Sequence, residues 1–387
     1  MGQCFSPTSR RKQNAHDAYI RSSERNLPFR KLPLHTHSIL KDYEITKKVI
    51  GTGVSGPIRL IKRRSNGERC ALKILLDGRA ARHEVELQFL ACQHPNVAGV
   101  VDVYENLFRD ARCLFVVMEY MSGGQLLDRI KTGQARISER DVLRIVRDLG
   151  SAIAYIHSMG IIHRDIKLEN MMYSNKGMLK LTDFGFALME KEQPKATPST
   201  SYYPTSEVLQ PSCFDKSCDM WSLGIIMYFL LCGYPPYFSV QEEDFSESTQ
   251  QKIITGEYLF PADQWDKVSL QAKSIVRRLL AADPGKRMGA DELMSEAWIV
   301  RCSRALDTPL CTSDLINDEK YFHLQDEMRE HLTGIRAINK QLIIKPLSDA
   351  INPILMRRRK MQSADVDSIS NTYTSTIPPC PTPCPSA

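Results

Sequence analysis

The chain has 387 residues, a formal net charge of +6 and 42% hydrophobic residues, which is enough apolar content for a sizeable core. No apolar run reaches the roughly 18 residues that a membrane-spanning helix needs, and no secretory signal peptide opens the sequence. The 11 cysteines are scattered without metal-ligand spacing, so we expect reduced thiols in an intracellular protein rather than disulfides or a zinc site.

The first residues fit an acylation pattern. Gly2 becomes the N-terminus once the initiator Met is removed, and Ser6 stands where N-myristoylation requires a hydroxyl. One myristoyl chain binds membranes only marginally, with an association constant of roughly 10⁴ M⁻¹, so a second signal is needed. Palmitoylation of Cys4, or attraction of the basic residues 10–12 to anionic lipid, could supply that signal. We expect residues 1–42 to be a flexible, basic segment with lipidation sites at Gly2 and Cys4.

A glycine-rich stretch follows, Gly51-Thr52-Gly53-Val54-Ser55-Gly56-Pro57-Ile58. Glycines let the backbone lie against phosphate oxygens with no Cβ in the way. A lone pattern of this kind is as often an ordinary loop as a nucleotide site. Pro57 removes one backbone donor, which a strand tolerates only at an edge position.

A lysine and a glutamate come next in the order expected of a phosphate-binding pair. Ala71-Leu72-Lys73 lies on an apolar, strand-like run, and residues 82–87 read as a helix that carries Glu84. A lysine on a strand is ordinarily a solvated surface charge. The order of the motifs favours instead a Lys73 that binds phosphate, with Glu84 as its partner.

Two motifs in the middle of the chain decide the chemistry. His163-Arg164-Asp165-Ile166-Lys167-Leu168-Glu169-Asn170 places an Asp five residues before an Asn, and Asp183-Phe184-Gly185 begins thirteen residues later. This order is the signature of the protein-kinase catalytic loop and metal loop. Asp165 is predicted to take the proton of the acceptor hydroxyl, and Lys167 to neutralise charge on the moving phosphate. Asn170 and Asp183 are predicted to hold Mg²⁺, a hard cation that prefers oxygen ligands, and Lys73 to hold the α- and β-phosphates of ATP.

Further downstream, Asp219 begins the stretch that opens a long apolar helix over residues 225–232. The matching Asp of kinases anchors the backbone of the catalytic loop. Glu207 and Arg287 are placed to form an ion pair that ties the substrate-binding segment to the helical lobe. The alternative is two unrelated surface charges.

Strand-like segments from residue 43 to about 110 include one helix, and residues 122–299 read mostly as helices. The pattern predicts an α+β, two-lobed protein-kinase fold over residues 43–299, with a small β-rich lobe, one regulatory helix and a larger helical lobe. Residues 300–360 are predicted to be a helical regulatory extension. Residues 361–387 are rich in Ser, Thr and Pro, which cannot build a core, so we expect a disordered tail.

Beyond these motifs the chain resembles the MAP-kinase-activated protein kinases, a branch of the calcium/calmodulin-dependent kinase group of serine/threonine kinases. The likeness runs from about Asp42 to Lys360. Its most specific stretches are residues 81–87, 101–107, 181–187, 215–224 and 230–236.

The resemblance implies ATP and Mg²⁺ as cofactors, a hinge at Glu119-Tyr120-Met121 and Met118 as gatekeeper beside the adenine. The nucleotide-binding residues are then Ile50, Gly51, Thr52, Gly53, Val54, Ser55, Gly56, Pro57, Ile58, Ala71, Lys73, Met118, Glu119 and Met121. Lys167 fits the serine/threonine rather than the tyrosine pattern.

The resemblance also implies activation by an upstream, stress-type MAP kinase at Thr197-Pro198 and Thr308-Pro309. A bare Thr-Pro is more often an ordinary turn, but two at family positions favour regulation. Phosphate on Thr197 would add about two negative charges that Arg164 could pair with.

Near the C-terminus an amphipathic stretch around Met328, Leu332 and Ile335 has helical spacing. In the family such a helix covers the substrate cleft and carries an export signal, although it could simply pack on the large lobe. A MAP-kinase docking site is implied at Ile354, Leu355, Arg357, Arg358, Arg359 and Lys360, apolar anchors followed by basic residues. The same basic run could serve nuclear import, or be a solvated charge run with no partner.

The sequence departs from the family in two places that bear on substrates. Tyr203-Pro204-Thr205-Ser206-Glu207 replaces the usual Ala-Pro-Glu ending, which puts the shape of the peptide-binding platform in doubt. Gln125 replaces a Glu that can receive a basic residue of the substrate, and we expect Asp128 to compensate only in part. We still expect an Arg upstream of the phosphorylated Ser.

The leading interpretation is a monomeric serine/threonine protein kinase, cytoplasmic with nuclear shuttling and with peripheral membrane association through N-myristoylation. The alternative is a pseudokinase or scaffold that docks a MAP kinase at a membrane, for which residues 203–206 are the only argument. The complete set of catalytic residues argues against it. Nucleic acid is not an expected partner, because no aromatic platform accompanies the basic tail.

Overall fold

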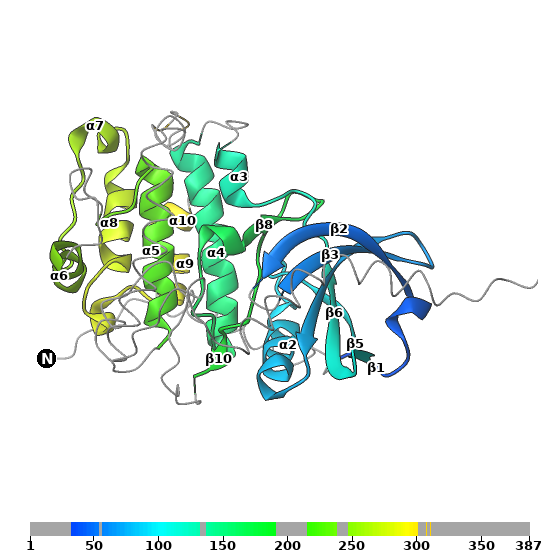
Figure 1. Cartoon of the computed structure of the whole chain (residues 1–387). Coiled ribbons are helices and arrows are strands. Elements are labelled where there is room, and N and C mark those ends of the chain that lie inside the picture. The colour runs from blue at the N-terminus through cyan, green and yellow to red at the C-terminus, as the bar shows by residue number, and fades with distance from the viewer. Residues whose placement is uncertain are drawn as a thin grey trace, which may run out of the picture.

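The computed structural model describes residues 32–53, 56–131, 137–190, 215–237, 247–300, 307 and 310. Figure 1 shows a curved sheet with one helix, α2 (Arg79–Ala91), against it, and a larger group of helices to the side. The α+β, two-lobed fold expected from the sequence is confirmed.

The small lobe is a six-stranded sheet in the order β1-β5-β6-β4-β3-β2. Its strands are β1 (Leu34–His35), β2 (Tyr43–Gly53), β3 (Gly56–Arg63), β4 (Arg69–Leu76), β5 (Val100–Phe108) and β6 (Ala111–Glu119). Neighbouring strands are antiparallel except β1 and β5, which are parallel. The sheet ends at Glu119 rather than near residue 110, because β6 pairs with β4 on one side and β5 on the other.

Both faces of this sheet are buried, in two separate apolar clusters. Leu72 of β4 belongs to the cluster that contains Tyr104 and Phe115. Leu75, three residues along the same strand, belongs to the cluster to which α2 contributes Val85 and Phe89. Successive side chains of a strand point to opposite faces, so β4 fills both cores. This double burial explains the continuous apolar run that marked β4 in the sequence.

The prediction that residues 1–42 are flexible is wrong for their last part. Residues 32–42 contain β1 and the short 3-10 helix η1 (Ile39–Lys41), and Ile39 is only 1% exposed. The polar residues that suggested a solvated segment are paired, His35 with Asp102 and His37 with Asp42. A two-residue strand has no periodicity to detect, and its partner β5 lies far along the chain. Residues 1–31 lie outside the described residues.

The large lobe is mostly helical. Its longer elements are α3 (Leu126–Lys131), α4 (Glu139–Ser158), α5 (Ser217–Cys232), α6 (Glu247–Thr255), α8 (Leu270–Leu279) and α9 (Ala290–Ser295). Shorter elements are β7 (Ile161–Ile162), η2 (Leu168–Asn170), β8 (Met171–Tyr173), β9 (Leu179–Leu181), β10 (Leu188–Met189), α7 (Ala262–Trp265), η3 (Pro284–Lys286) and α10 (Ala297–Val300). Strand β7 pairs with β10, and β8 with β9.

Helix α5 is the centre of the large lobe. Nearly every residue of α5 is buried, which is why its sequence is apolar all round rather than striped. It begins at Ser217, so Asp219 lies in its first turn, as the sequence suggested. A Cβ on Gly224 would lie 2.8 Å from Cδ2 of Leu280, so only glycine lets α8 approach α5 this closely.

Helix α4 begins with a capping box in which Ser138 and Asp141 satisfy each other's backbone N–H groups. Its first residue, Glu139, is 1% exposed. The Glu139 carboxylate accepts hydrogen bonds from the backbone and hydroxyl of Ser269, at 2.8 and 2.7 Å, and from the indole of Trp298 at 2.9 Å. One buried carboxylate thus joins α4 to the N-cap of α8 and to α10.

Replacing Glu139 with Ala should destabilise the protein by about 3 kcal/mol, because buried donors on Ser269 and Trp298 lose a charged acceptor. Urea unfolding of both proteins measures the difference. Glu292→Ala is the matched control, since Glu292 pairs with Arg278 on the surface and its side chain is 53% exposed. A Glu139→Ala loss no larger than that of the control would contradict this account.

Among the described helices, none combines the length and the apolar character needed to cross a bilayer. Within the same part of the chain, five cysteines have free thiols: Cys70, Cys92, Cys113, Cys218 and Cys232.

Candidate active site

Lys73, Glu84 and Asp183 meet where the two lobes face each other. The Nζ of Lys73, on β4, lies 2.7 Å from Oε1 of Glu84 on α2 and 3.0 Å from Oδ1 of Asp183. Lys73 is 8% exposed, so the ammonium is largely withdrawn from water. The pairing of Lys73 with Glu84 that the sequence predicted is confirmed.

The charges of this group stabilise one another. Burial alone would lower the pKa of Lys73, but the carboxylates of Asp183 and Glu84 outweigh it and raise that pKa. Burial would raise the pKa of Asp183, and the nearby Lys73 ammonium reverses this and lowers it. Both residues are therefore charged at neutral pH, as a site for phosphate and metal requires.

The catalytic loop brings three predicted residues together beside that group. Asp165 is 1% exposed, and its Oδ2 lies 2.8 Å from Nζ of Lys167. The amide Nδ2 of Asn170, in η2, donates to the Asp165 backbone oxygen at 2.8 Å and to Oδ2 at 3.0 Å. The other carboxylate oxygen, Oδ1, is buried and has no hydrogen-bond partner among the described residues. A buried acceptor of this kind is suited to a hydroxyl donor that arrives with a substrate.

Asp219 holds the backbone of this loop from α5. Its carboxylate accepts hydrogen bonds from the backbone N–H of His163 at 2.9 Å and of Arg164 at 2.8 Å. The imidazole of His157, on α4, lies 2.8 Å from Oδ2 of the same carboxylate. Arg164 has a φ of 64°, a left-handed conformation that is unfavourable for a residue with a side chain. The anchoring role predicted for Asp219 is confirmed by these contacts.

The metal loop is set by a buried aromatic residue. Phe184 is 0% exposed and meets the His163 ring edge to face, with centroids 4.8 Å apart. It belongs to the large-lobe core cluster, which also contains Leu87 and Ala91 of α2. Asp183 has a φ of 63°, so the chain turns sharply between the buried Phe184 and the carboxylate facing Lys73.

Asn170 and Asp183 fit the requirements of Mg²⁺. Both amide hydrogens of Asn170 serve Asp165, which leaves its amide oxygen for a cation. The contacts of Asp183 with Lys73 and with the Gly185 N–H use Oδ1 and leave Oδ2. Mg²⁺ is seldom held by protein ligands alone. It usually takes one or two protein oxygens and completes its coordination with nucleotide phosphates and water, so these two oxygens suit it. In the described ranges no group of three or more His, Cys, Asp or Glu forms a separate metal site.

The glycine-rich stretch forms the ends of β2 and β3. Gly51 pairs with Ile58 and Thr52 with Pro57. Gly56 has a φ of 123°, which needs glycine. Strand β3 is not an edge strand, since it lies between β4 and β2, but its pairing with β4 starts only at Arg59, so Pro57 costs no hydrogen bond on that side.

The predicted hinge, Glu119-Tyr120-Met121, begins at the last residue of β6. Ala71 of β4 pairs with Met118 of β6, so both lie at one end of the sheet. Glu119 ends the strand, its carboxylate 2.9 Å from Nζ of Lys180, and Met121 is 8% exposed. Ile50, Gly53 and Lys73 belong to the same sheet.

A second contact between the lobes involves His94, after α2. Its Nδ1 accepts the Asn96 N–H at 3.2 Å, so Nε2 carries the proton that bonds Oγ of Ser151, on α4, at 3.0 Å. Burial, with a smaller effect from the Lys180 charge, lowers the pKa of His94 to about 4.

We expect this histidine to make stability fall on mild acidification. Below its ordinary pKa of about 6.5, the unfolded chain binds a proton that folded His94 excludes until about pH 4. Between pH 7 and pH 5 the free energy of unfolding should therefore fall by about 1 kcal/mol more in the wild type than in His94→Gln. Urea unfolding at both pH values measures it, and equal losses would contradict the assignment.

Several predicted residues lie outside the described residues, and the structure does not place them. They are Val54, Ser55, the 203–207 segment, Thr197, Thr308, Gly2, Cys4 and the C-terminal residues 328–338 and 354–360. The proposed partner of Glu207, Arg287, is described: its guanidinium donates to the backbone oxygens of Ala281 at 3.0 Å and Ser217 at 3.1 Å. The Glu207–Arg287 pair stays a prediction.

Sequence reasoning missed two supports of the site. His157 reaches Asp219 across 62 positions, and no motif links them. Thr182 fixes the start of the metal loop, because its N–H and its hydroxyl both donate to the backbone oxygen of Asn170, at 2.9 and 3.1 Å. Its place directly before Asp183 is the one signal that could have revealed it.

Comparison with known proteins agrees with this geometry. Residues 43–299 match the family model of the protein kinase domain. Over 341 residues the chain is 41% identical to human MAP kinase-activated protein kinase 2, covering 86% of this chain and 85% of the relative. It is 38% identical over 333 residues to the protein of the same name from Drosophila melanogaster, covering 84% and 93%. Human MAP kinase-activated protein kinase 5 is 34% identical over 364 residues, covering 86% and 76%.

These matches extend over most of both chains, and the residues predicted to be catalytic lie together in one site. The chain therefore belongs to the MAP kinase-activated protein kinase family and is a protein serine/threonine kinase.

Proposed function

We propose that this kinase transfers the γ-phosphate of ATP to Ser or Thr hydroxyls of proteins in response to an upstream, stress-type MAP kinase. The observation that carries the first part is the assembly of Lys73, Glu84 and Asp183 beside Asp165, whose Oδ1 has no partner among the described residues. Phosphoryl transfer asks the protein mainly for positioning and charge neutralisation, which such an assembly supplies.

Asp165 is the group that receives the substrate hydroxyl. Its Oδ2 is held by Lys167 and Asn170, so the carboxylate cannot rotate freely, and Oδ1 is the acceptor left for the hydroxyl proton. Lys167 lies close enough to Asp165 to reach the phosphate that moves onto that hydroxyl. It would offset the negative charge that develops there.

Lys73 is held for the nucleotide by two carboxylates. In the structure its ammonium is shared between Glu84 and Asp183. The α- and β-phosphates would take the place of one of these contacts, with Glu84 keeping the side chain extended. Bound between Asn170 and Asp183, Mg²⁺ would neutralise phosphate charge and hold the phosphates in line.

The regulatory part of the proposal is supported by the names of the relatives, which describe activation by MAP kinases. Thr197 and Thr308 are the proposed phosphorylation sites, and residues 354–360 the proposed docking site for the MAP kinase. Neighbours of Thr308 contact α4 and the segment just before it: Asp307 pairs with Arg140 at 2.5 Å, and the Leu310 N–H donates to the backbone oxygen of Ile137 at 2.8 Å. A phosphate on Thr308 would add negative charge beside that pair.

Location is proposed from sequence alone. Acylation at Gly2 and Cys4 would bring the kinase to membranes, and the basic residues 357–360 would support movement between cytoplasm and nucleus. We propose a monomer that acts on protein substrates with an Arg upstream of the acceptor Ser.

A phosphate-transfer assay tests the proposal. The full chain is incubated with labelled ATP and an Arg-x-x-Ser peptide, before and after treatment with an active stress-type MAP kinase. A Thr197→Ala, Thr308→Ala double variant is run alongside. Transfer that rises on treatment in the wild type only is the expected result.

The opposite outcome is equally informative. Absence of transfer in every state, with the MAP kinase still bound to the C-terminal region, would overturn the proposal and make the chain a scaffold. Transfer that is already maximal without treatment would overturn only the regulatory part.

A further inference from the structure

Residues 32–42, here called the N-terminal strap, lie along the β5 edge of the small-lobe sheet. Leu34 and His35 pair in parallel with Val103 and Tyr104, and the Val103 N–H donates to the Pro33 oxygen at 2.9 Å. The strap thus adds a strand to an edge that would otherwise expose its backbone groups.

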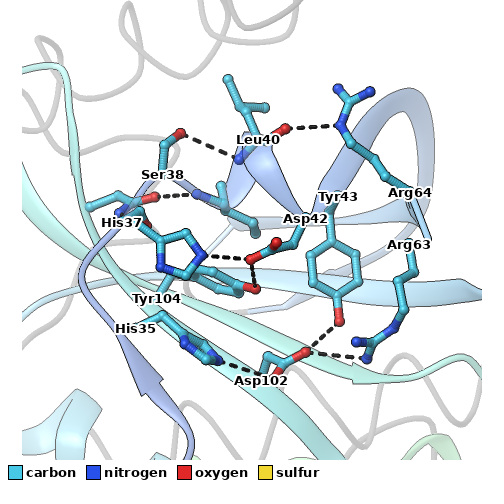
Figure 2. Close-up of polar contacts among 12 residues, drawn as sticks. His35, His37, Ser38, Leu40, Asp42, Tyr43, Arg63, Arg64, Asp102 and Tyr104 are labelled. Carbon is cyan, nitrogen blue, oxygen red and sulfur yellow. Dashed lines mark hydrogen bonds and ion pairs between the residues drawn. The ribbon is translucent and has the colours of Figure 1, made fainter.

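Polar side chains of β5 fasten the strap, as Figure 2 shows for most of them. Asp102 accepts from His35 at 3.3 Å, and Tyr104 donates to Asp42 at 2.7 Å. His37 lies 2.6 Å from the same oxygen of Asp42. Asn106 closes the set: its Oδ1 accepts the Ile39 N–H at 2.9 Å and its Nδ2 donates to the His37 oxygen at 3.0 Å. These contacts, from Asp102 to Asn106 along β5, fix the register of the strap.

Leu32 of the strap packs against an apolar cluster that includes side chains of α2, the helix that carries Glu84. To this cluster α2 contributes Val85 and Phe89, and β5 contributes Val103. Val85 directly follows Glu84 in α2. Leu34, by contrast, is 43% exposed and takes no part in that cluster.

Strand β5 is also bonded to α2 by charge. Arg82, in the first turn of α2, lies 2.7 Å from Oε1 of Glu105 and makes two bonds of 2.8 Å with Asp77. Glu105 stands between Tyr104 and Asn106, which hold the strap. The N-cap of α2, Gly78, has no side chain to cap the helix, so the Arg82 contacts are the side-chain hydrogen bonds that the structure describes for its first turn.

We propose that the strap, through Leu32 above all, is a positioning element for phosphoryl transfer: it holds β5 and α2 where Glu84 reaches Lys73. Leu32 touches neither nucleotide nor substrate and acts through Glu84. The inference rests on the proposed function, and it adds a determinant outside the residues 43–299 that match the kinase domain. The physical reason is contiguity, since packed side chains and hydrogen bonds run without a break from the strap through β5 to α2.

The test is a set of variants in the full chain. Leu32→Asp puts a charge against the apolar cluster that contains Val85 and Phe89 of α2, and it should lower kcat roughly fivefold to thirtyfold. Leu32→Met keeps an apolar side chain of similar volume and should retain activity within about twofold. Leu34→Asp makes the same chemical change on the exposed side of the strap and should also change kcat less than about twofold.

A double-mutant cycle separates positioning from general destabilisation. When Glu84→Gln has already broken the pair with Lys73, adding Leu32→Asp should cost little more, because there is no pair left to align. A merely structural role would reduce activity by the same factor in both backgrounds. Equal factors, or equal effects of Leu32→Asp and Leu34→Asp, would overturn the inference.

Hydrogen exchange provides a readout that needs no catalysis. Leu32→Asp should speed amide exchange in residues 79–91 and leave that of α5 in the large lobe unchanged. If the wild type transfers no phosphate, the proposed function fails while exchange still tests the strap. Unchanged exchange in α2 would overturn the strap's role even in an active kinase.

Discussion

Replacing Asp165 with Asn is expected to lower kcat by about 10² to 10⁴-fold, the usual contribution of a general base. The amide cannot take the proton of the substrate hydroxyl, although it fills the same volume. It also weakens the contact with Lys167, whose Nζ lies 2.8 Å from Oδ2. The peptide assay after MAP-kinase treatment measures this loss, and KM for ATP should change little because Asp165 does not bind the nucleotide.

Asp148→Asn is the matched control. Asp148 lies on α4, pairs with Arg147 at 3.2 Å and has a side chain 30% exposed, so the same chemical change there removes only a surface charge. Its kcat should stay within about twofold of the wild type. An Asp165→Asn enzyme as active as the control would refute the role assigned to Asp165.

Replacing Asp219 with Ala should have the largest effect on stability, a loss of about 3–5 kcal/mol. Asp219 is 0% exposed, and its removal leaves two backbone N–H groups and the His157 imidazole without their acceptor. Transfer should fall as well, because the strained φ of 64° at Arg164 is held by that carboxylate. Urea unfolding and the peptide assay measure the two effects.

The pH dependence of this variant checks the cause. Burial works against the charged form of Asp219, but the hydrogen bond and charge of His157 prevail and lower its pKa. A lowered folded pKa means that stability from this group is present above the unfolded pKa of about 3.9 and is lost as the pH falls below it. The variant should therefore lose less stability than the wild type between pH 5 and pH 3. Asp266→Ala, at the exposed C-cap of α7, controls for loss of any surface Asp. A cost no greater than that of this control would contradict the anchoring role.

Much of the site could be predicted from short motifs because each motif is local. Asp165 and Asn170 are five residues apart, so one loop conformation fixes their relation. Lys73 and Glu84 were found from their order alone, although one lies on a strand and the other on a helix. The identity of their third partner, Asp183, required the structure, because 110 positions separate it from Lys73.

Supports of the site were harder to predict. No motif marked Glu139 or His157, and only their partners Ser269, Trp298 and Asp219 show why a polar side chain is buried there. The strap was misjudged as flexible because histidines and short strands carry no periodic signal. A sequence pattern predicts that polar residues are exposed to solvent, and only the structure shows that a partner distant in sequence pairs with them.

The sequence by itself determined the family and the reaction and predicted the catalytic residues, since phosphoryl transfer needs particular side chains at fixed local spacings. It also predicted a β-rich small lobe with one helix and a mostly helical large lobe, because apolar periodicity reflects which face is buried. Tertiary structure alone decided how those side chains are held: the Asp183 contact with Lys73, the Asp219 anchor and the packing of Leu32 on the α2 cluster. These join positions far apart in the chain, and their energies depend on burial and geometry that exist only once the lobes have folded.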